Sequence, residues 1–274
     1  MTQRTPIGVY VFLLVLAFFF AFPLVVSILT SVRTQQDVVT HGFFALPDKV
    51  TFQNFSDAWH SGGFRITYRN SLVVTFIKVP LGIFIAALAA YPIAKFRFRL
   101  RESLLVLFLL GLGIPINVTL LPLTILLHKM RLLNTLWALL FPYIVFGLPF
   151  QILICRGFFR GIPDELIDAS RIDGCSEFGV FLRIILPLSG PVLAALFIID
   201  FFATWNEFLM ALIFIHSNEW KTVSLGLMAF QGQFGSSFPV INAGVVIAIL
   251  PVVTIYILLQ RYFVSGITAG ALKE

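Results

Sequence analysis

The sequence predicts an all-α membrane protein with six transmembrane helices, and three observations support this. Of its 274 residues, 59% are hydrophobic and only 12% are charged, and the mean hydropathy is +0.97. Soluble proteins average about a quarter charged residues. The apolar residues gather in six runs, each close to the roughly 20 residues that a bilayer-crossing helix needs. Lys and Arg concentrate at the ends of these runs, so we interpret the net charge of +6 as a topology signal rather than an affinity for nucleic acid.

The six spans are expected at about residues 7–29, 71–94, 103–127, 135–155, 188–215 and 241–262. The first run has no small-residue cleavage site and is too long for a signal peptide, so we expect it to be retained. In lipid a segment must satisfy its own backbone hydrogen bonds, which makes each run a helix. Seven prolines are expected to kink or interrupt these helices: Pro23, Pro80, Pro115, Pro122, Pro142, Pro149 and Pro251.

The distribution of Lys and Arg predicts the orientation. The stretch "KFRFRLR" (95–101) lies between the second and third spans, and the loop 156–187 carries four more arginines. With six spans both termini share the side of these loops, and that side holds eleven Lys and Arg against seven on the other. The positive-inside rule therefore places both termini and the loop 156–187 in the cytoplasm. The whole chain is expected to form one transmembrane domain.

The external segment 30–69 is long and mixes aromatic with polar residues. Two interpretations stay open: a small cap over a pore mouth, or a loop whose Phe and Trp side chains anchor at headgroup level. Cys155 and Cys175 are expected to be small apolar fillers, since a cytoplasmic disulfide is disfavoured.

The loop 156–187 contains a compact polar insert, "DELIDASRIDGCSEFGVFLRIILPLSGP" (164–191). Pro163 suits a first helical turn, and the acidic residues that follow favour the helix N-terminus. Gly174 is expected to stop this helix as a left-handed cap, and Ser176 to cap a second helix that ends before Pro187. Two short helices joined at a Gly elbow would make a rigid knob; a plain connector is the alternative. One face of the first helix is predicted to carry Leu166, Ala169, Ser170 and Asp173.

This insert resembles the EAA loop of permease subunits of ATP-binding cassette (ABC) importers. Asp168, Ala169 and Ser170 take the three leading positions, Gly174 takes the glycine and Pro187 the distal proline. Four further stretches agree in order with carbohydrate-type permeases similar to the G-type subunit of the maltose transporter: "YRNSLVV" (68–74), "FGLPFQILICRGFFRGIP" (146–163), "WNEFLMALIF" (205–214) and "QRYFVSGITAGALKE" (260–274). The sequence departs from the family pattern by Asp for Glu at 168, Ser for Ala at 170 and Cys for Ala at 175.

The resemblance implies a type I ABC importer permease fold and a role in importing a sugar or related polyol. It implies a second permease subunit, two ATPase subunits that bind ATP and Mg, an external solute-binding protein, and a bacterial or archaeal cytoplasmic membrane. It further implies that the ATPase subunit is contacted by Glu165, Asp168, Ala169, Ser170, Asp173, Gly174 and Pro187, with Asp168 pairing a basic residue there. The matching C-terminal tail reaches between the ATPase subunits, which implies contacts by Gly270, Ala271, Leu272 and Lys273.

The sequence lacks the residues of an enzyme. It has no phosphate-binding loop of the form GxxxxGK[ST], so ATP hydrolysis requires a partner. Its four histidines are scattered without metal-ligand spacing, and no nucleophile–His–acid arrangement stands out. We therefore expect no catalytic residue, no metal and no cofactor bound by this chain.

Polar residues inside spans are candidates for the solute path. These are Asn117, Trp205, Asn206 and Glu207, although polar groups in spans often only join helices. Asp200 and Glu207 are seven residues apart and are expected on roughly one helix face. Lys78 is expected to snorkel or pair rather than bind solute. Alternatives are a permease for a non-sugar solute such as glycerol phosphate, or a secondary transporter, which would show an inverted repeat that we do not find.

Overall fold

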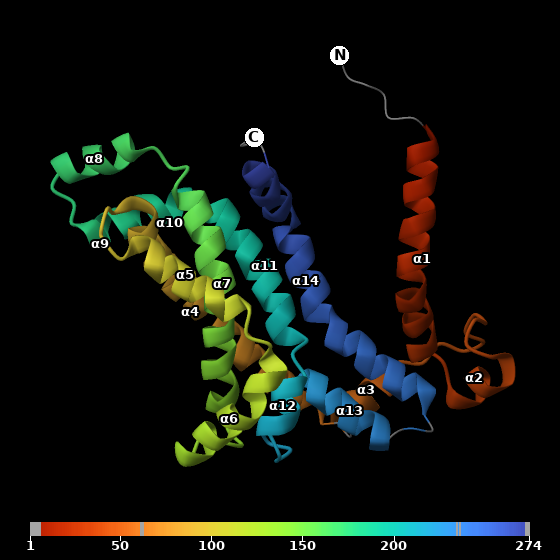
Figure 1. Cartoon of the computed structure of the whole chain (residues 1–274). Helices are drawn as coiled ribbons and strands as arrows, with labels where there is room; N and C mark the ends of the chain where they lie inside the picture. Colours follow the sequence, from red (N-terminus) through yellow and green to blue (C-terminus); the bar gives the residue numbers. More distant parts are fainter. Residues whose placement is uncertain (1–6, 61–62, 234, 236, 272–274) are drawn as a thin grey trace. The chain divides into compact units, whose positions relative to one another are not determined.

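The computed structural model describes residues 7–60, 63–233, 235 and 237–271, with residues 229, 231 and 261–271 described by their backbone alone. Every regular element in this part is a helix (Figure 1). The chain divides into two compact units. One consists of residues 1–68 and 225–250, and the other of residues 69–224 and 251–274. The long helices α4 (Phe64–Lys95) and α14 (Phe238–Ala271) and the short helix α13 (Val223–Gln233) each contribute to both.

The first unit contains the long helix α1 (Ile7–Ser31) and two short helices, α2 (Gln35–His41) and α3 (Gln53–His60). The apolar side chains of α1 are exposed over most of its length, as expected for a helix surrounded by lipid. The amide of Asn54 donates at 2.8 Å to the carbonyls of Ser31 and Arg33, which ties α3 to the end of α1. Part of the segment 30–69 is therefore helical, and α3 is held against the end of α1.

Close helix packing in the first unit depends on two glycines, which have no side chain. A Cβ on Gly244 of α14 would lie 3.0 Å from the rings of both Phe64 and Phe230. These two buried rings meet edge to face, with centroids 5.3 Å apart. A Cβ on Gly226 of α13 would lie 2.6 Å from a methyl carbon of Thr67. Glycine thus permits the first turns of α4 to contact both α13 and α14.

The second unit contains the rest of α4 and the remaining helices. These are α5 (Arg101–Leu112), α6 (Ile116–Lys129), α7 (Trp137–Phe159), α8 (Asp164–Ile172), α9 (Glu177–Val180), the π-helical turn η1 (Phe181–Ile185), α10 (Leu186–Leu188), α11 (Gly190–Trp205) and α12 (Leu209–Phe214). Its core places the small residues Ala86, Ala87 and Ala90 of α4 beside larger side chains that include Phe159 and Phe181.

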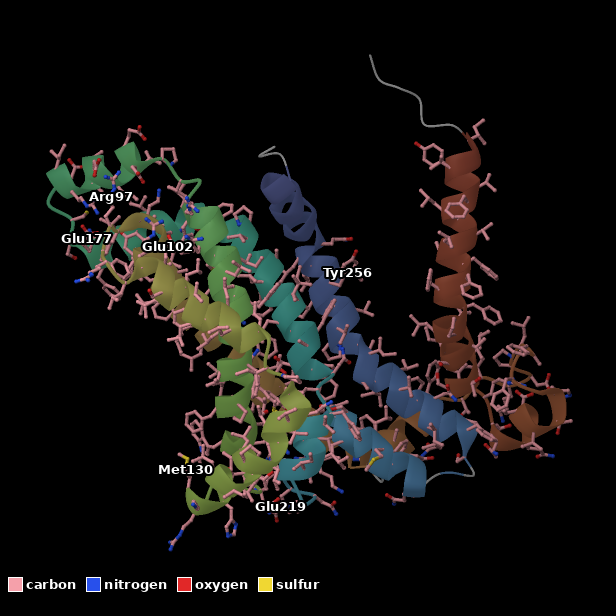
Figure 2. All side chains as sticks on the ribbon, in the orientation of Figure 1. Arg97, Glu102, Met130, Glu177, Glu219 and Tyr256 are labelled. Carbon is pink, nitrogen blue, oxygen red and sulfur yellow. The ribbon has the colours of Figure 1, made fainter. Side chains whose placement is uncertain are left out.

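The two ends of the second unit differ. In Figure 1, α8 and α9 lie at one end, and α6 and α12 lie at the opposite end. Figure 2 labels Arg97, Glu102 and Glu177 at the α8 end and Met130 and Glu219 at the other. The polar insert and the basic stretch 95–101 are therefore brought to the same end.

By length and composition, the described residues contain up to six membrane spans, two of which are bent helix pairs. Four single helices are long and apolar enough: Ile7–Ser31, Phe64–Lys95, Trp137–Phe159 and Phe238–Gln260. The pair α5 and α6 is bent by 96°. Pro115 adopts an extended backbone there (φ −65°, ψ 130°), and a proline disfavours helical geometry at the residue before it. The segment Glu177–Leu188 is bent by 76° against α11.

Two expectations about helix continuity are wrong. The apolar run 188–215 is not one helix, because α11 ends at Trp205 and α12 begins at Leu209. The second helix of the insert does not end before Pro187, because α9, η1 and α10 continue through it. In the π-helical turn the N–H of Leu186 donates to the carbonyl of Phe181. This wider turn directly precedes Pro187, which has no N–H to donate and whose ring needs space within a helix.

Candidate functional site

The helix α8 is anchored at its start by the end of α4. Lys95 Nζ lies 2.5 Å from Asp164 Oδ1 and 2.5 Å from the carbonyl of Ile162. The ammonium group beside Asp164 lowers the pKa of that carboxyl. Pro163 is the residue before the first helical turn rather than within it, with an extended ψ of 135°. The start of the knob is thus fixed by a charged contact and by the proline.

The end of α8 is a left-handed glycine elbow, as predicted. Gly174 has a φ of +83°, and a Cβ placed there would meet nothing within 4 Å. The N–H of Cys175 donates to the carbonyl of Ser170 and the N–H of Gly174 to that of Arg171, both at 3.0 Å. These two bonds form a Schellman motif. The predicted cap is also present, since Ser176 Oγ accepts a hydrogen bond from the N–H of Gly179.

Arg171 joins the two short helices, and sequence reasoning missed it. Its Nη1 lies 2.9 Å from Asp168 Oδ1 on α8, and its Nε lies 2.8 Å from Glu177 Oε1 on α9. These two carboxylates raise the pKa of the guanidinium. Tyr91 of α4 donates to Glu177 at 3.0 Å, which extends the network to the long helix. The i, i+3 spacing of Asp168 and Arg171 was the signal available in the sequence.

The buried face of α8 is formed by Ile167 and Ser170. Ala169 and Asp173 lie on the exposed surface, as do Glu165 and Pro187. Leu166 is 45% exposed and Ile172 is 86% exposed, although both are apolar. The elbow therefore presents apolar and acidic side chains together on an outward surface.

The four candidates for the solute path do not form one cluster. Asn117 is exposed on α6, and Trp205 is buried, with its ring stacked on Phe201 at 5.8 Å. Asn206 caps α11 and donates to the carbonyl of Phe202 at 3.0 Å. Glu207 accepts hydrogen bonds from the N–H groups of Met210 and Ala211 at the start of α12, and from the hydroxyl of Tyr143.

The expected common face of Asp200 and Glu207 is absent. Asp200 lies within α11, but Glu207 lies in the break before α12 and acts as a cap there. Asp200 instead pairs with Lys78 of α4, which confirms that Lys78 pairs. Both residues are buried, and a Cβ on Gly147 of α7 would lie 3.3 Å from Lys78 Nζ. A glycine at this position leaves room for the pair where α4, α7 and α11 meet.

Comparison with known proteins decides the family. Residues 78–268 match the family described as "Binding-protein-dependent transport system inner membrane component". This chain belongs to that family. The permease is 37% identical to the probable ABC transporter permease protein YurM of Bacillus subtilis (strain 168), over 98% of this chain and 89% of YurM. It is 36% identical to the arabinooligosaccharides transport system permease protein AraQ of Halalkalibacterium halodurans, over 94% of this chain and 93% of AraQ.

The fold is that of a type I ABC importer permease. The permease superposes with a TM-score of 0.82 on a chain from a bacterial ABC transporter involved in the import of the acidic polysaccharide alginate, at 21% identity, over 96% of this chain and 100% of that chain. The permease is a multi-pass inner-membrane transport subunit and not an enzyme. The secondary-transporter alternative is therefore wrong.

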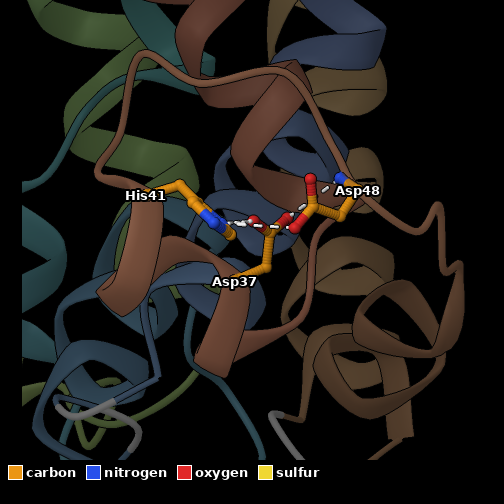
Figure 3. A group of neighbouring side chains, drawn as sticks. All are labelled: Asp37, His41 and Asp48. Carbon is orange, nitrogen blue, oxygen red and sulfur yellow. Dashed lines mark hydrogen bonds and ion pairs between the residues drawn. The ribbon is translucent and has the colours of Figure 1, made fainter.

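The segment 30–69 of the permease contains a cluster of carboxylate and imidazole groups that sequence spacing did not reveal. The ligand-type atoms of Asp37, His41 and Asp48 lie within 4.8 Å of one another (Figure 3). The fully buried guanidinium of Arg33 already contacts both carboxylate oxygens of Asp37 at 2.8 Å. This cation lowers the pKa of Asp37 and would repel a metal ion. We therefore interpret the cluster as a structural ion-pair network.

Of the four residues predicted to make tail contacts, the structure describes Gly270 and Ala271. Helix α14 continues through Gly270 to Ala271, so the C-terminal segment is helical further than the expected span. Leu272 and Lys273 lie outside the described residues.

Proposed function

We propose that the permease forms part of the translocation path for a sugar, oligosaccharide or related polyol delivered by an external binding protein. It assembles with a second permease subunit and two ATPase subunits, which bind ATP and Mg and supply the energy. Two observations support the sugar class: AraQ is named for arabinooligosaccharides, and the similar solved transporter imports alginate, a polysaccharide. Glycerol phosphate is the second candidate substrate.

The α8 elbow is the single observation that carries this proposal. A helix held at both ends transmits a displacement as a rigid body, and α8 is fixed by Lys95 at its start and by Gly174 and Arg171 at its end. Its exposed Leu166 and Ile172 offer apolar surface to a partner. The segment 156–187 therefore docks in the ATPase subunit on the cytoplasmic side, where both termini also lie.

Asp168 is the residue that we assign to the ion pair with the ATPase subunit. Its side chain is 64% exposed, and Arg171 holds its Oδ1 in a fixed direction. A carboxylate oriented in this way can accept a second charge-assisted hydrogen bond from a partner's cation. Arg171 thus acts as a positioning residue for Asp168.

Glu207 and Asn206 are the residues that we propose to line the translocation path of the solute. Both lie in the break between α11 and α12, and Asn206 is exposed. Asn117 lies just after the bend between α5 and α6. Breaks in membrane helices free polar groups where they border a cavity, which is the setting that a hydroxylated solute requires.

The test uses the complex co-expressed with its neighbouring transport genes and reconstituted in liposomes. We expect the tagged permease to retain an ATPase and a second permease, and binding protein loaded with an oligosaccharide to stimulate ATP hydrolysis. Asp168→Lys should reduce ATPase retention or coupling, whereas Asp168→Glu should preserve both. Normal assembly and transport by Asp168→Lys would exclude this residue from the ion pair. Stimulation by glycerol phosphate rather than sugars would overturn the substrate class.

A further inference from the structure

The α8 end of the second unit carries a cluster of arginines from two separate segments. Arg97 and Arg99 precede α5 and Arg101 begins it, while Arg156 and Arg160 lie at the end of α7. Helix α5 packs directly against α7, which brings these segments together. Arg97, Arg99 and Arg160 are exposed. This end of the helix pair therefore presents a strongly positive surface.

One carboxylate lies among these guanidinium groups and only partly satisfies them. Glu102 Oε1 lies 3.3 Å from Arg156 Nη2 and 3.6 Å from Arg101 Nε, and its side chain is 70% exposed. The longer distance exceeds that of a hydrogen bond. The Nε–H groups of both Arg101 and Arg156 are buried and have no hydrogen-bond partner among the described residues. Two guanidinium groups face a single carboxylate here and leave a net positive charge, so this corner favours an additional anion.

A groove on α5 begins at the same corner. It is open, has a volume of about 410 Å³, and is lined by Glu102, Ser103, Val106, Leu107 and Leu110. The residues of its first turn are polar and the next two turns are apolar. Leu107 and Leu110 are 62% and 64% exposed. The surface thus changes from cationic to hydrocarbon along one helix.

We propose that this groove binds an anionic phospholipid. The guanidinium groups of Arg101 and Arg156, which are 22% and 12% exposed, attract the lipid phosphate through their accessible part, and Ser103 donates its hydroxyl at the same level. An acyl chain lies along Val106, Leu107 and Leu110. The choline cation of a zwitterionic lipid would be repelled by the arginines of this corner, whereas the terminal glycerol of phosphatidylglycerol is uncharged and leaves the negative phosphate free to pair with them.

Two features of the site favour a lipid over a soluble anion or a protein. A free phosphate would fill only the polar turn and leave the apolar turns unoccupied. A protein partner would have to compete with lipid for leucines that face outward from a membrane helix. The bound lipid would also relieve repulsion between guanidinium groups at the point where α7 leads into the segment 156–187. This inference does not depend on the transported solute.

The test measures lipid binding by the purified transporter complex. Retained lipids are counted by native mass spectrometry after exchange into mixed micelles of phosphatidylglycerol and phosphatidylcholine. We expect preferential retention of phosphatidylglycerol, and a loss of about fivefold in its affinity for Arg156→Gln, the effect of one basic residue near a membrane surface. Glu102→Gln should change the affinity in the opposite direction, because it removes the competing carboxylate. Lys129→Gln carries the same charge change as Arg156→Gln at the other end of the unit and should have no effect.

Three results would overturn the proposal. Equal retention of the two lipids would show that the corner does not select an anion. Displacement of phosphatidylglycerol by millimolar glycerol phosphate would show an anion site without a chain-binding groove. Unchanged lipid retention in Glu102→Gln would show that this carboxylate does not compete. Because Glu102→Gln is expected to gain affinity, failure of Arg156→Gln to fold leaves the proposal testable.

Discussion

At the scale of single residues, the ion pair of Lys78 and Asp200 is the charge contact that joins α4 to α11. We predict that Lys78→Met or Asp200→Leu alone destabilises the permease by about 3–5 kcal/mol, because each leaves one buried charge without its partner. The double variant should be closer to wild type than either single variant. Thermal unfolding of the purified complex supplies the four values of this double-mutant cycle. Additive effects would show that the two residues do not interact.

The ion pair of Arg33 with Asp37 predicts a pH dependence. Arg33 lowers the pKa of Asp37, so the contribution of this contact is full above the pKa of an unfolded Asp, about 3.9. It is lost as the pH falls through the lower pKa of the folded state. The protection of residues 30–60 against hydrogen exchange, relative to the unfolded chain at the same pH, should therefore stay high at pH 5 and fall as the pH drops below about 4. Asp37→Asn should show lower protection than wild type even at pH 7; unchanged protection in that variant would contradict the assigned contact.

At the scale of elements, the elbow between α8 and α9 depends on one backbone angle. A Cβ added at Gly174 or at Gly157 would meet open space, but only Gly174 has a positive φ. We predict that Gly174→Ala destabilises by about 1 kcal/mol and Gly174→Val by more, whereas Gly157→Ala, within α7, stabilises by about 0.5–1 kcal/mol. Thermal unfolding and solute-stimulated ATP hydrolysis of the complex measure the two effects.

Gly174→Val should also lower coupling, since a strained elbow no longer fixes the direction of α8. Membrane insertion should be retained, because the spans do not depend on this residue. Full stimulation and full uptake by Gly174→Val would show that the elbow geometry is not required for coupling.

At the scale of the whole molecule, hydropathy predicted the helical membrane class because apolar runs can be recognised from neighbouring residues alone. The prolines and glycines that interrupt or end helices are local signals of the same kind. The Gly174 elbow and the Ser176 cap were predictable for the same reason. The break at residues 206–208 was not, because hydropathy does not distinguish a polar residue within a span from one that caps a new helix, as Glu207 caps α12 through its carboxylate. Contacts between distant segments, such as Tyr91 with Glu177, have no signature in a single sequence.

The C-terminus provides a test at the scale of the assembled transporter. Helix α14 runs to Ala271, and the family resemblance assigns the segment after the last span to the space between the ATPase subunits. We predict that deleting residues 270–274 leaves membrane insertion intact and lowers complex stability or solute-stimulated ATP hydrolysis. The small side chains of Gly270 and Ala271 suit close backbone approach, so Gly270→Leu should reproduce the deletion at full length. Subunit retention and ATPase activity equal to wild type in both variants would show that the tail makes no contact that the complex requires.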